Sequence, residues 1–248
     1  MSVKSWSEKS ITLAGPTGAL ELRLGQHQRL DSESGPDLQV EEVPKCGFIM
    51  CHPHPLYLGT MDNKVVTTLV RGASRLIVEK GAGIKAEGVQ GLDTIRFNFR
   101  GVGQSEGQHG DGKGEQDDLA AVVNYAVTEL GWQKIYLAGF SFGAGVACLY
   151  AGEQSEKNAK RIAGLFLVAP AVSNFDAPST LPFEFESHVY MGDADEVVPF
   201  DDVEHWVDLL TPQPHFQVFE GASHFFHGRL LDLKKSFLED LSNVISQS

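Results

Sequence analysis

The chain has 248 residues, of which 42% are hydrophobic and 21% charged, a composition that excludes a disordered protein. Its 33 acidic residues outnumber its 20 basic ones, and the net charge of −13 disfavours nucleic acid or an anionic membrane as the main partner. We expect no secretory signal and no membrane span, because no apolar run approaches the roughly 18 residues that a span needs. The cysteines at 46, 51 and 148 form no CxxC pair and are expected to be reduced thiols in a cytoplasmic protein.

The N-terminal part of the chain predicts an antiparallel hairpin. Residues 10–12 and 19–24 alternate apolar and polar side chains on either side of the turn sequence G-P-T-G. Residues 31–37 are rich in Ser, Glu, Gly and Pro and predict a surface loop. No low-complexity linker follows, so residues 1–45 are expected to belong to a single domain that spans residues 1–248.

Short apolar runs then alternate with helical patterns. Several of the runs are almost continuously apolar, as in strands that are buried on both faces of a parallel sheet. The expected strands are residues 46–51, 94–99, 135–138, 164–169, 188–191 and 216–219, and the expected helices are residues 63–78, 115–130, 143–152, 201–210 and 229–245. Asp62 is expected to cap the first helix and Gly131 to end the second. This alternation predicts an α/β fold with a mostly parallel central sheet, helices on both faces and little or no cap domain.

The pentapeptide G-F-S-F-G at residues 139–143 lies between an expected strand and an expected helix. In that setting G-x-S-x-G predicts a nucleophile elbow, in which Ser141 occupies a sharp and strained turn. The two glycines would let the strand and the helix approach closely. The N–H of Phe142, at the positive end of the helix, would then point toward an oxyanion. The alternative is an ordinary glycine-rich turn.

A serine hydroxyl needs a base, and a third group must orient that base. His224 follows the strand at 216–219 and should lie at the same sheet edge as the elbow, whereas His227 is expected to begin the last helix. The acid should follow the preceding strand, in the sequence G-D-A-D-E-V-V-P. Three carboxylates compete there: Asp193, Asp195 and Glu196. We favour Asp195 from its spacing to the proline, and we expect the other two on a solvated loop face.

The sequence H-P-H-P at residues 52–55 follows the strand at 46–51 and should supply the second donor of an oxyanion hole. Prolines have no N–H, so the early donors are limited to His52, His54 and Leu56. We favour His54, whose amide the flanking prolines would hold rigidly. Alternatively, His52 and His54 bind a metal with Asp62, but no further ligand has a recognisable spacing. We therefore expect no metal and no cofactor.

The sequence R-G-V-G-Q-S at residues 100–105 resembles a nucleotide-binding loop only superficially, because it is neither G-x-G-x-x-G nor a P-loop. We expect a tight loop in which Arg100 binds neighbouring carbonyls or carboxylates. Glu115, Asp117 and Asp118 are expected to place negative charge in the first turn of their helix.

Six segments together resemble a group of small bacterial α/β-hydrolases related to dienelactone hydrolases. The segments are H-P-H-P-L-Y-L-G-T-M-D-N-K-V-V, R-F-N-F-R-G-V-G-Q-S-E-G, G-K-G-E-Q-D-D-L, A-G-F-S-F-G-A, G-D-A-D-E-V-V-P and G-A-S-H-F-F-H-G. The resemblance implies a serine hydrolase without a large cap, with Ser141, Asp195 and His224 as its catalytic triad and the loop at His54 facing the oxyanion. Leu58 stands where a glycine is more usual, and it is expected to narrow the site entrance or make it more apolar.

These observations predict a hydrolase that cleaves a carboxylic ester, thioester or lactone through an acyl-enzyme intermediate. We expect a small or medium acyl substrate, bound in an open site lined by Leu56, Tyr57 and Phe140. A small-peptide hydrolase and a non-catalytic binding protein on the same fold are the alternatives. The sequence leaves open whether Cys51, beside the oxyanion loop, makes the site redox-sensitive.

Overall fold

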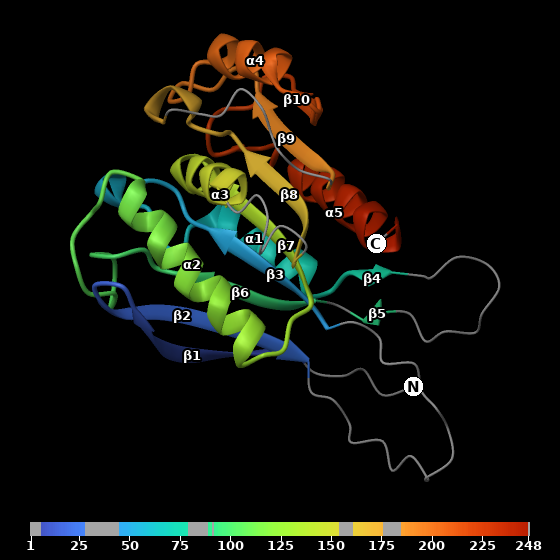
Figure 1. Cartoon of the computed structure of the whole chain (residues 1–248). Coiled ribbons are helices and arrows are strands. Elements are labelled where there is room, and N and C mark those ends of the chain that lie inside the picture. The colour runs from blue at the N-terminus through green and yellow to red at the C-terminus, as the bar shows by residue number, and fades with distance from the viewer. Residues whose placement is uncertain are drawn as a thin grey trace, which may run out of the picture.

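The computed structural model describes residues 6–27, 45–78, 89–90, 92–153, 161–175 and 185–247. The loop expected at residues 31–37 lies outside the described residues. Figure 1 shows a central twisted sheet with helices packed on both of its faces.

The main sheet has eight strands in the order β1-β2-β6-β3-β7-β8-β9-β10. The strands are β1 Trp6–Gly15, β2 Gly18–His27, β3 Cys46–Cys51, β6 Asp93–Phe97, β7 Lys134–Phe140, β8 Ile162–Val168, β9 Ser187–Gly192 and β10 His215–Phe219. β2 is antiparallel to both of its neighbours, and the strands from β6 to β10 are parallel. The predicted α/β fold with a mostly parallel sheet is confirmed.

The helices bury apolar side chains against this sheet. They are α1 Lys64–Ala73, α2 Lys113–Thr128, α3 Phe142–Glu153, α4 Phe200–Leu209 and α5 Leu230–Gln247, and the described residues also include the short 3₁₀ turns η1 Pro55–Tyr57 and η3 Val172–Asn174. On α1, the buried side chains Val65, Val66, Leu69 and Val70 follow the helical period. α1 packs with α5 behind the sheet in the view of Figure 1, and α2 packs with α3 in front of it.

The first expected helix was predicted too long. α1 ends at Ala73, and Ile77–Val78 instead forms the short strand β4, which pairs antiparallel with β5 at Val89–Gln90. Asn63 caps α1, because its Oδ1 accepts the Val65 N–H at 2.8 Å. Asp62, the predicted cap, forms an ion pair with Arg96 instead.

The end of α2 agrees better with its sequence signal. The cap residue is Glu129, and Gly131 follows with a φ of 70°, a conformation that favours glycine and turns the chain toward β7. The Trp132 N–H then returns to the carbonyl of Ala126 at 2.9 Å.

The N-terminal hairpin is joined to the sheet by both apolar and ionic contacts. Leu20, Leu22 and Leu24 on β2 are buried in the core. Arg96 on β6, which is 6% exposed, pairs with Glu8 on β1 at 2.9 Å. The hairpin is therefore part of the main sheet rather than a loose appendage.

The parallel direction of β3, β7, β9 and β10 brings the loops after all four strands to one edge of the sheet. This edge is where open α/β sheets bind ligands. Residues 169–186 are all that separates β8 from β9, which leaves no room there for a large inserted cap.

Candidate active site

Ser141 lies at the junction of β7 and α3 in a left-handed conformation, with a φ of 55°. Hydrogen bonds hold the turn on both sides. Its N–H donates to the Val168 carbonyl at 2.8 Å, and its own carbonyl accepts from Ala144, Gly145 and Ala171 at 3.0, 3.2 and 3.3 Å. The predicted strained turn is confirmed, because a residue with a Cβ adopts this conformation only when its surroundings impose it.

The two glycines of the pentapeptide are required by close backbone contacts. A Cβ at Gly139 would lie 2.2 Å from the Gly143 carbonyl oxygen, and a Cβ at Gly143 would lie 2.4 Å from the His52 carbonyl oxygen. Phe142 is the first residue of α3, so its N–H lies at the positive end of the helix.

His224 and Asp195 form a buried hydrogen-bonded pair. His224 Nδ1 lies 2.8 Å from Asp195 Oδ2, and the side chains are 3% and 0% exposed. The other carboxylate oxygen of Asp195 accepts the N–H groups of Val197 and Val198, both at 2.8 Å. These bonds fix the carboxylate, which in turn requires a proton on Nδ1 of the imidazole.

The two carboxylates beside Asp195 are exposed, as the sequence predicted, and they also make backbone hydrogen bonds that the sequence did not indicate. Asp193 accepts the Gly221 N–H at 2.6 Å, and Glu196 accepts the His224 N–H at 3.1 Å. Both therefore bind the backbone of the loop that carries His224. His227 was predicted differently: it lies within this loop, with its N–H 3.4 Å from Ser223 Oγ, and α5 begins at Leu230.

Phe140 connects the elbow with His224. Its ring lies 4.9 Å from the His224 ring and 5.8 Å from the Phe225 ring, measured between centroids. Phe140 has no exposed surface, because β7 is buried on both faces. It thus packs against the imidazole, and it does not line an open site, which corrects the prediction.

His52, the first histidine of the H-P-H-P loop, is a buried structural residue. Its Nε2 accepts the Phe99 N–H at 3.1 Å, and its Nδ1 lies 2.6 Å from the Pro53 carbonyl. Burial lowers the pKa of His52 to about 4, so the ring is neutral near pH 7. Both ring nitrogens of His52 are engaged, so His52 is not available as a metal ligand. This argues against the alternative in which His52 and His54 bind a metal together. Within the described residues, no three His, Cys, Asp or Glu side chains are arranged to hold a metal ion.

His54 organises the rest of this loop. Its carbonyl accepts the N–H groups of Tyr57 and Gly59 at 3.1 and 3.0 Å, and its Nδ1 accepts the Leu56 N–H at 3.2 Å. The Leu56 N–H, one of the three predicted oxyanion donors, is therefore already used. The His54 ring lies 4.7 Å from the Phe142 ring, next to the elbow. Burial and the nearby His109 lower the pKa of His54.

The predicted lining residues Leu56 and Tyr57 extend from η1 into solvent, with 68% and 82% of their surface exposed. Cys51, at the end of β3, has no exposed surface, and burial raises the pKa of its thiol. A buried neutral thiol is a poor nucleophile, which argues against the redox role that the sequence left open.

Arg100 behaves as predicted, whereas of the three carboxylates expected in the first turn of α2 only Glu115 lies there. The Arg100 guanidinium binds the fully buried Asp118 at 2.8 Å, which ties the loop after β6 to α2. Glu115 accepts the N–H groups of Gly110 and Gly112 at 2.9 and 2.8 Å, and His109 Nδ1 lies 2.9 Å from it. Sequence reasoning missed His109, whose ring lies 5.0 Å from that of His54.

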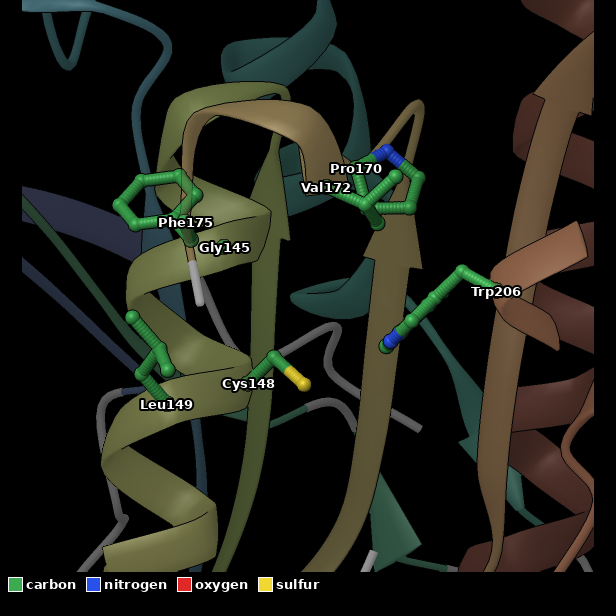
Figure 2. Close-up of a pocket in the computed structure, with 7 residues that line it drawn as sticks. All are labelled: Gly145, Cys148, Leu149, Pro170, Val172, Phe175 and Trp206. Carbon is green, nitrogen blue, oxygen red and sulfur yellow. The ribbon is translucent and has the colours of Figure 1, made fainter. Parts of the chain in front are cut away.

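Sequence reasoning also missed an apolar crevice next to the elbow. Figure 2 shows it between α3, the loop after β8 and α4, with Trp206 reaching in from α4. The Phe175 ring, which also lines it, packs directly on Gly145, because a Cβ at Gly145 would lie 2.2 Å from that ring. The residues from 170 to 187 have no clear periodicity, so the sequence carried no signal for this wall.

Comparisons with known proteins agree with this architecture. A family model described as alpha/beta hydrolase fold matches residues 82–195. An alpha-beta serine hydrolase homologue from Coxiella burnetii is 36% identical, with 94% of this chain and 97% of that chain covered and a TM-score of 0.74. XC6422 from Xanthomonas campestris, an α/β serine hydrolase without a lid, is 32% identical, with 94% and 93% covered and a TM-score of 0.72. An uncharacterized Rickettsia prowazekii protein is 28% identical over 245 residues, which are 95% of this chain and 90% of that protein.

The described helices include none with the length and apolar character that a bilayer crossing requires. Two relatives above 30% identity are aligned over almost the whole chain, and both are α/β serine hydrolases or homologues of them. The strand order, the strained elbow and these relatives lead to one conclusion: the chain belongs to the α/β-hydrolase family.

Proposed function

We propose that this protein is a serine hydrolase that cleaves carboxylic esters, thioesters or lactones of small or medium acyl groups. One observation carries the proposal: the Asp195-bonded His224 packs on Phe140, the residue before the strained Ser141. The Coxiella and Xanthomonas relatives, which are described as serine hydrolases, support the same reaction class.

In the proposed mechanism the Ser141 hydroxyl attacks the acyl carbonyl while His224 Nε2 takes its proton. Asp195 keeps the proton of the neutral ring on Nδ1, so that Nε2 has the free lone pair, and it stabilises the imidazolium that forms. The imidazolium then protonates the leaving group. Water, activated by the same ring, attacks the acyl-enzyme and releases the acid.

The oxyanion would be stabilised by the N–H groups of Phe142 and His54. Both are held in place before substrate binds, Phe142 by the first turn of α3 and His54 by its turn of hydrogen bonds. Such a preorganised donor contributes about 2.7–4 kcal/mol to lowering the barrier. Leu56 and Tyr57 are the residues that we propose to contact the substrate, and Phe140 contributes by supporting His224.

The proposed substrate is a small molecule rather than a nucleic acid or a membrane. The acidic net charge of −13 supports this choice. We also propose that the enzyme acts in the cytoplasm, because the chain has only three cysteines and none of them forms a CxxC pair.

The test is reaction with a fluorophosphonate, which forms a bond from Ser Oγ to phosphorus and releases fluoride. Intact-protein mass should show a single adduct on the wild-type protein and none on Ser141→Ala, which should retain its circular dichroism spectrum. Hydrolysis of a panel of esters, thioesters and lactones should be lost in the same variant. No adduct on folded wild-type protein would favour a binding protein on this fold, and undiminished hydrolysis by Ser141→Ala would refute the mechanism.

A further inference from the structure

Leu56, Tyr57 and Leu58 are three consecutive exposed apolar residues, here called the apolar rim. Their exposed fractions are 68%, 82% and 93%. Single exposed apolar side chains are ordinary on protein surfaces, but three consecutive large ones are not. No charged residue occurs between Cys51 and Met61, so the segment offers only apolar and neutral polar groups.

Leu58 has a second unfavourable feature. Its φ of 62° and ψ of 20° are left-handed values, which disfavour leucine and most other residues with a Cβ. Glycine or asparagine would adopt them more easily, and would also expose less apolar surface to water. The left-handed backbone ends η1, where glycine is the usual residue, and folding stability does not explain an exposed leucine at this position. Strain of this kind is characteristic of functional sites.

The apolar rim is rigidly linked to the proposed catalytic centre. His54 accepts hydrogen bonds from Leu56, Tyr57 and Gly59, which fixes the whole turn. The Tyr57 ring lies 4.9 Å from the His54 ring, which in turn lies 4.7 Å from the Phe142 ring. A group bound on the rim would therefore be held at a defined position relative to the Phe142 and His54 amides.

A second apolar side chain lies on the loop that carries His224. Phe225 is 39% exposed, and its ring lies 5.1 Å from the His224 ring. This loop and the His54 loop lie at the same edge of the sheet, because they follow the parallel strands β10 and β3. Apolar surface is thus available beside both the oxyanion donors and the base.

We propose that the apolar rim binds the hydrocarbon chain of an uncharged substrate, and that the enzyme therefore prefers medium-chain acyl esters to acetyl esters. The proposal rests on the serine hydrolase function and adds its substrate class. An apolar chain is the occupant that the chemistry favours, because the rim has no cation to pair with an anionic group. Each methylene that leaves water for an apolar surface increases affinity by up to about fourfold.

The test compares kcat/KM for the p-nitrophenyl esters of octanoate and acetate. The wild-type protein should prefer octanoate, and Leu58→Asn should lower the octanoate-to-acetate ratio by about tenfold, which corresponds to roughly two methylenes of lost contact. Asparagine accepts the left-handed backbone, so this variant should fold. The control is Leu209→Asn, at another exposed leucine that ends α4, and it should leave the ratio unchanged. An unchanged ratio in Leu58→Asn would overturn the proposal.

A second readout separates this proposal from the proposed function. Inactivation rates with methyl and octyl fluorophosphonates report on Ser141 and on the chain-binding surface together. The wild-type protein should react faster with the octyl reagent than with the methyl reagent. A lower ratio of these two rates in Leu58→Asn or in Tyr57→Ser would support the rim as the chain-binding surface. Equal rates for both reagents would refute the rim while leaving the serine hydrolase intact. The absence of any Ser141 adduct would refute both.

Discussion

At the scale of single residues, His52 shows how a histidine in a motif can be structural. The ring is fully buried, accepts the Phe99 N–H and lies against the Pro53 carbonyl, so it joins the loop after β3 to the end of β6. Burial lowers its pKa from 6.5 to about 4. Protonation would therefore break this junction rather than assist a reaction.

The sign of this shift predicts how stability changes with pH. The His52 contribution is fully present above pH 6.5 and is lost as the pH falls toward 4, because the unfolded chain takes up its proton first. About 2 kcal/mol should disappear between pH 8 and pH 5. Urea unfolding at both values should show this loss in the wild-type protein and a smaller loss in His52→Gln. Equal losses in the two proteins would mean that His52 is not buried as a neutral ring.

The carboxylates around His224 mark a limit of what a sequence can predict. The motif G-D-A-D-E indicated three candidates, but the roles of Asp193 and Glu196 depend on a loop 28 positions away in the chain. The parallel pairing of β9 with β10 brings that loop next to the carboxylates. Spacing alone therefore predicted the exposed face on which both side chains lie, but not the backbone N–H groups that they bind.

At the scale of elements, the strands could be predicted well because burial on both faces leaves a continuous apolar run. β3 spans the residues that its sequence predicted, and β7 and β8 differ from their predictions by up to two residues at each end. The end of α1 was missed for the opposite reason. Ile77 and Val78 fit an amphipathic period, and their pairing with residues 89–90 is a contact that periodicity does not reveal.

The junction of β7 and α3 allows a test of packing at the elbow. A Cβ on Gly143 would lie 2.4 Å from the His52 carbonyl oxygen, a backbone atom that cannot rotate away. Gly143→Ala should therefore lower the free energy of unfolding by about 3 kcal/mol, at the upper end for overpacking. The measurement is urea denaturation, with Ala147→Gly on the same helix as a control that loses only helix propensity and a small buried methyl group. Wild-type stability in Gly143→Ala would show that α3 and the loop after β3 are less closely packed than this distance indicates.

At the scale of the whole molecule, the parallel strands bring the candidate site residues, which are far apart in the sequence, to one edge of the sheet. Ser141 follows β7, His54 follows β3, Asp195 follows β9 and His224 follows β10. Their residue types were visible in the sequence, and their convergence is a property of strand order and direction. The apolar crevice lined by Phe175 and Trp206 could not be predicted from the sequence, because it depends on how α3, α4 and the loop after β8 pack together.

The excess of acidic residues gives the whole molecule a negative charge that should affect how it attracts charged substrates. A net charge of −13 repels anionic substrates over distances that depend on salt, since the screening length falls from about 30 Å at 0.01 M to about 8 Å at 0.15 M. If the protein hydrolyses phenyl acetate and 4-carboxyphenyl acetate, raising the salt across this range should increase kcat/KM by about two- to fivefold for the anionic ester alone. The neutral ester provides the internal control, because salt does not change its attraction. A decrease for the anionic ester would reveal a local positive potential at the site that outweighs the net charge, and would argue against a preference for uncharged substrates.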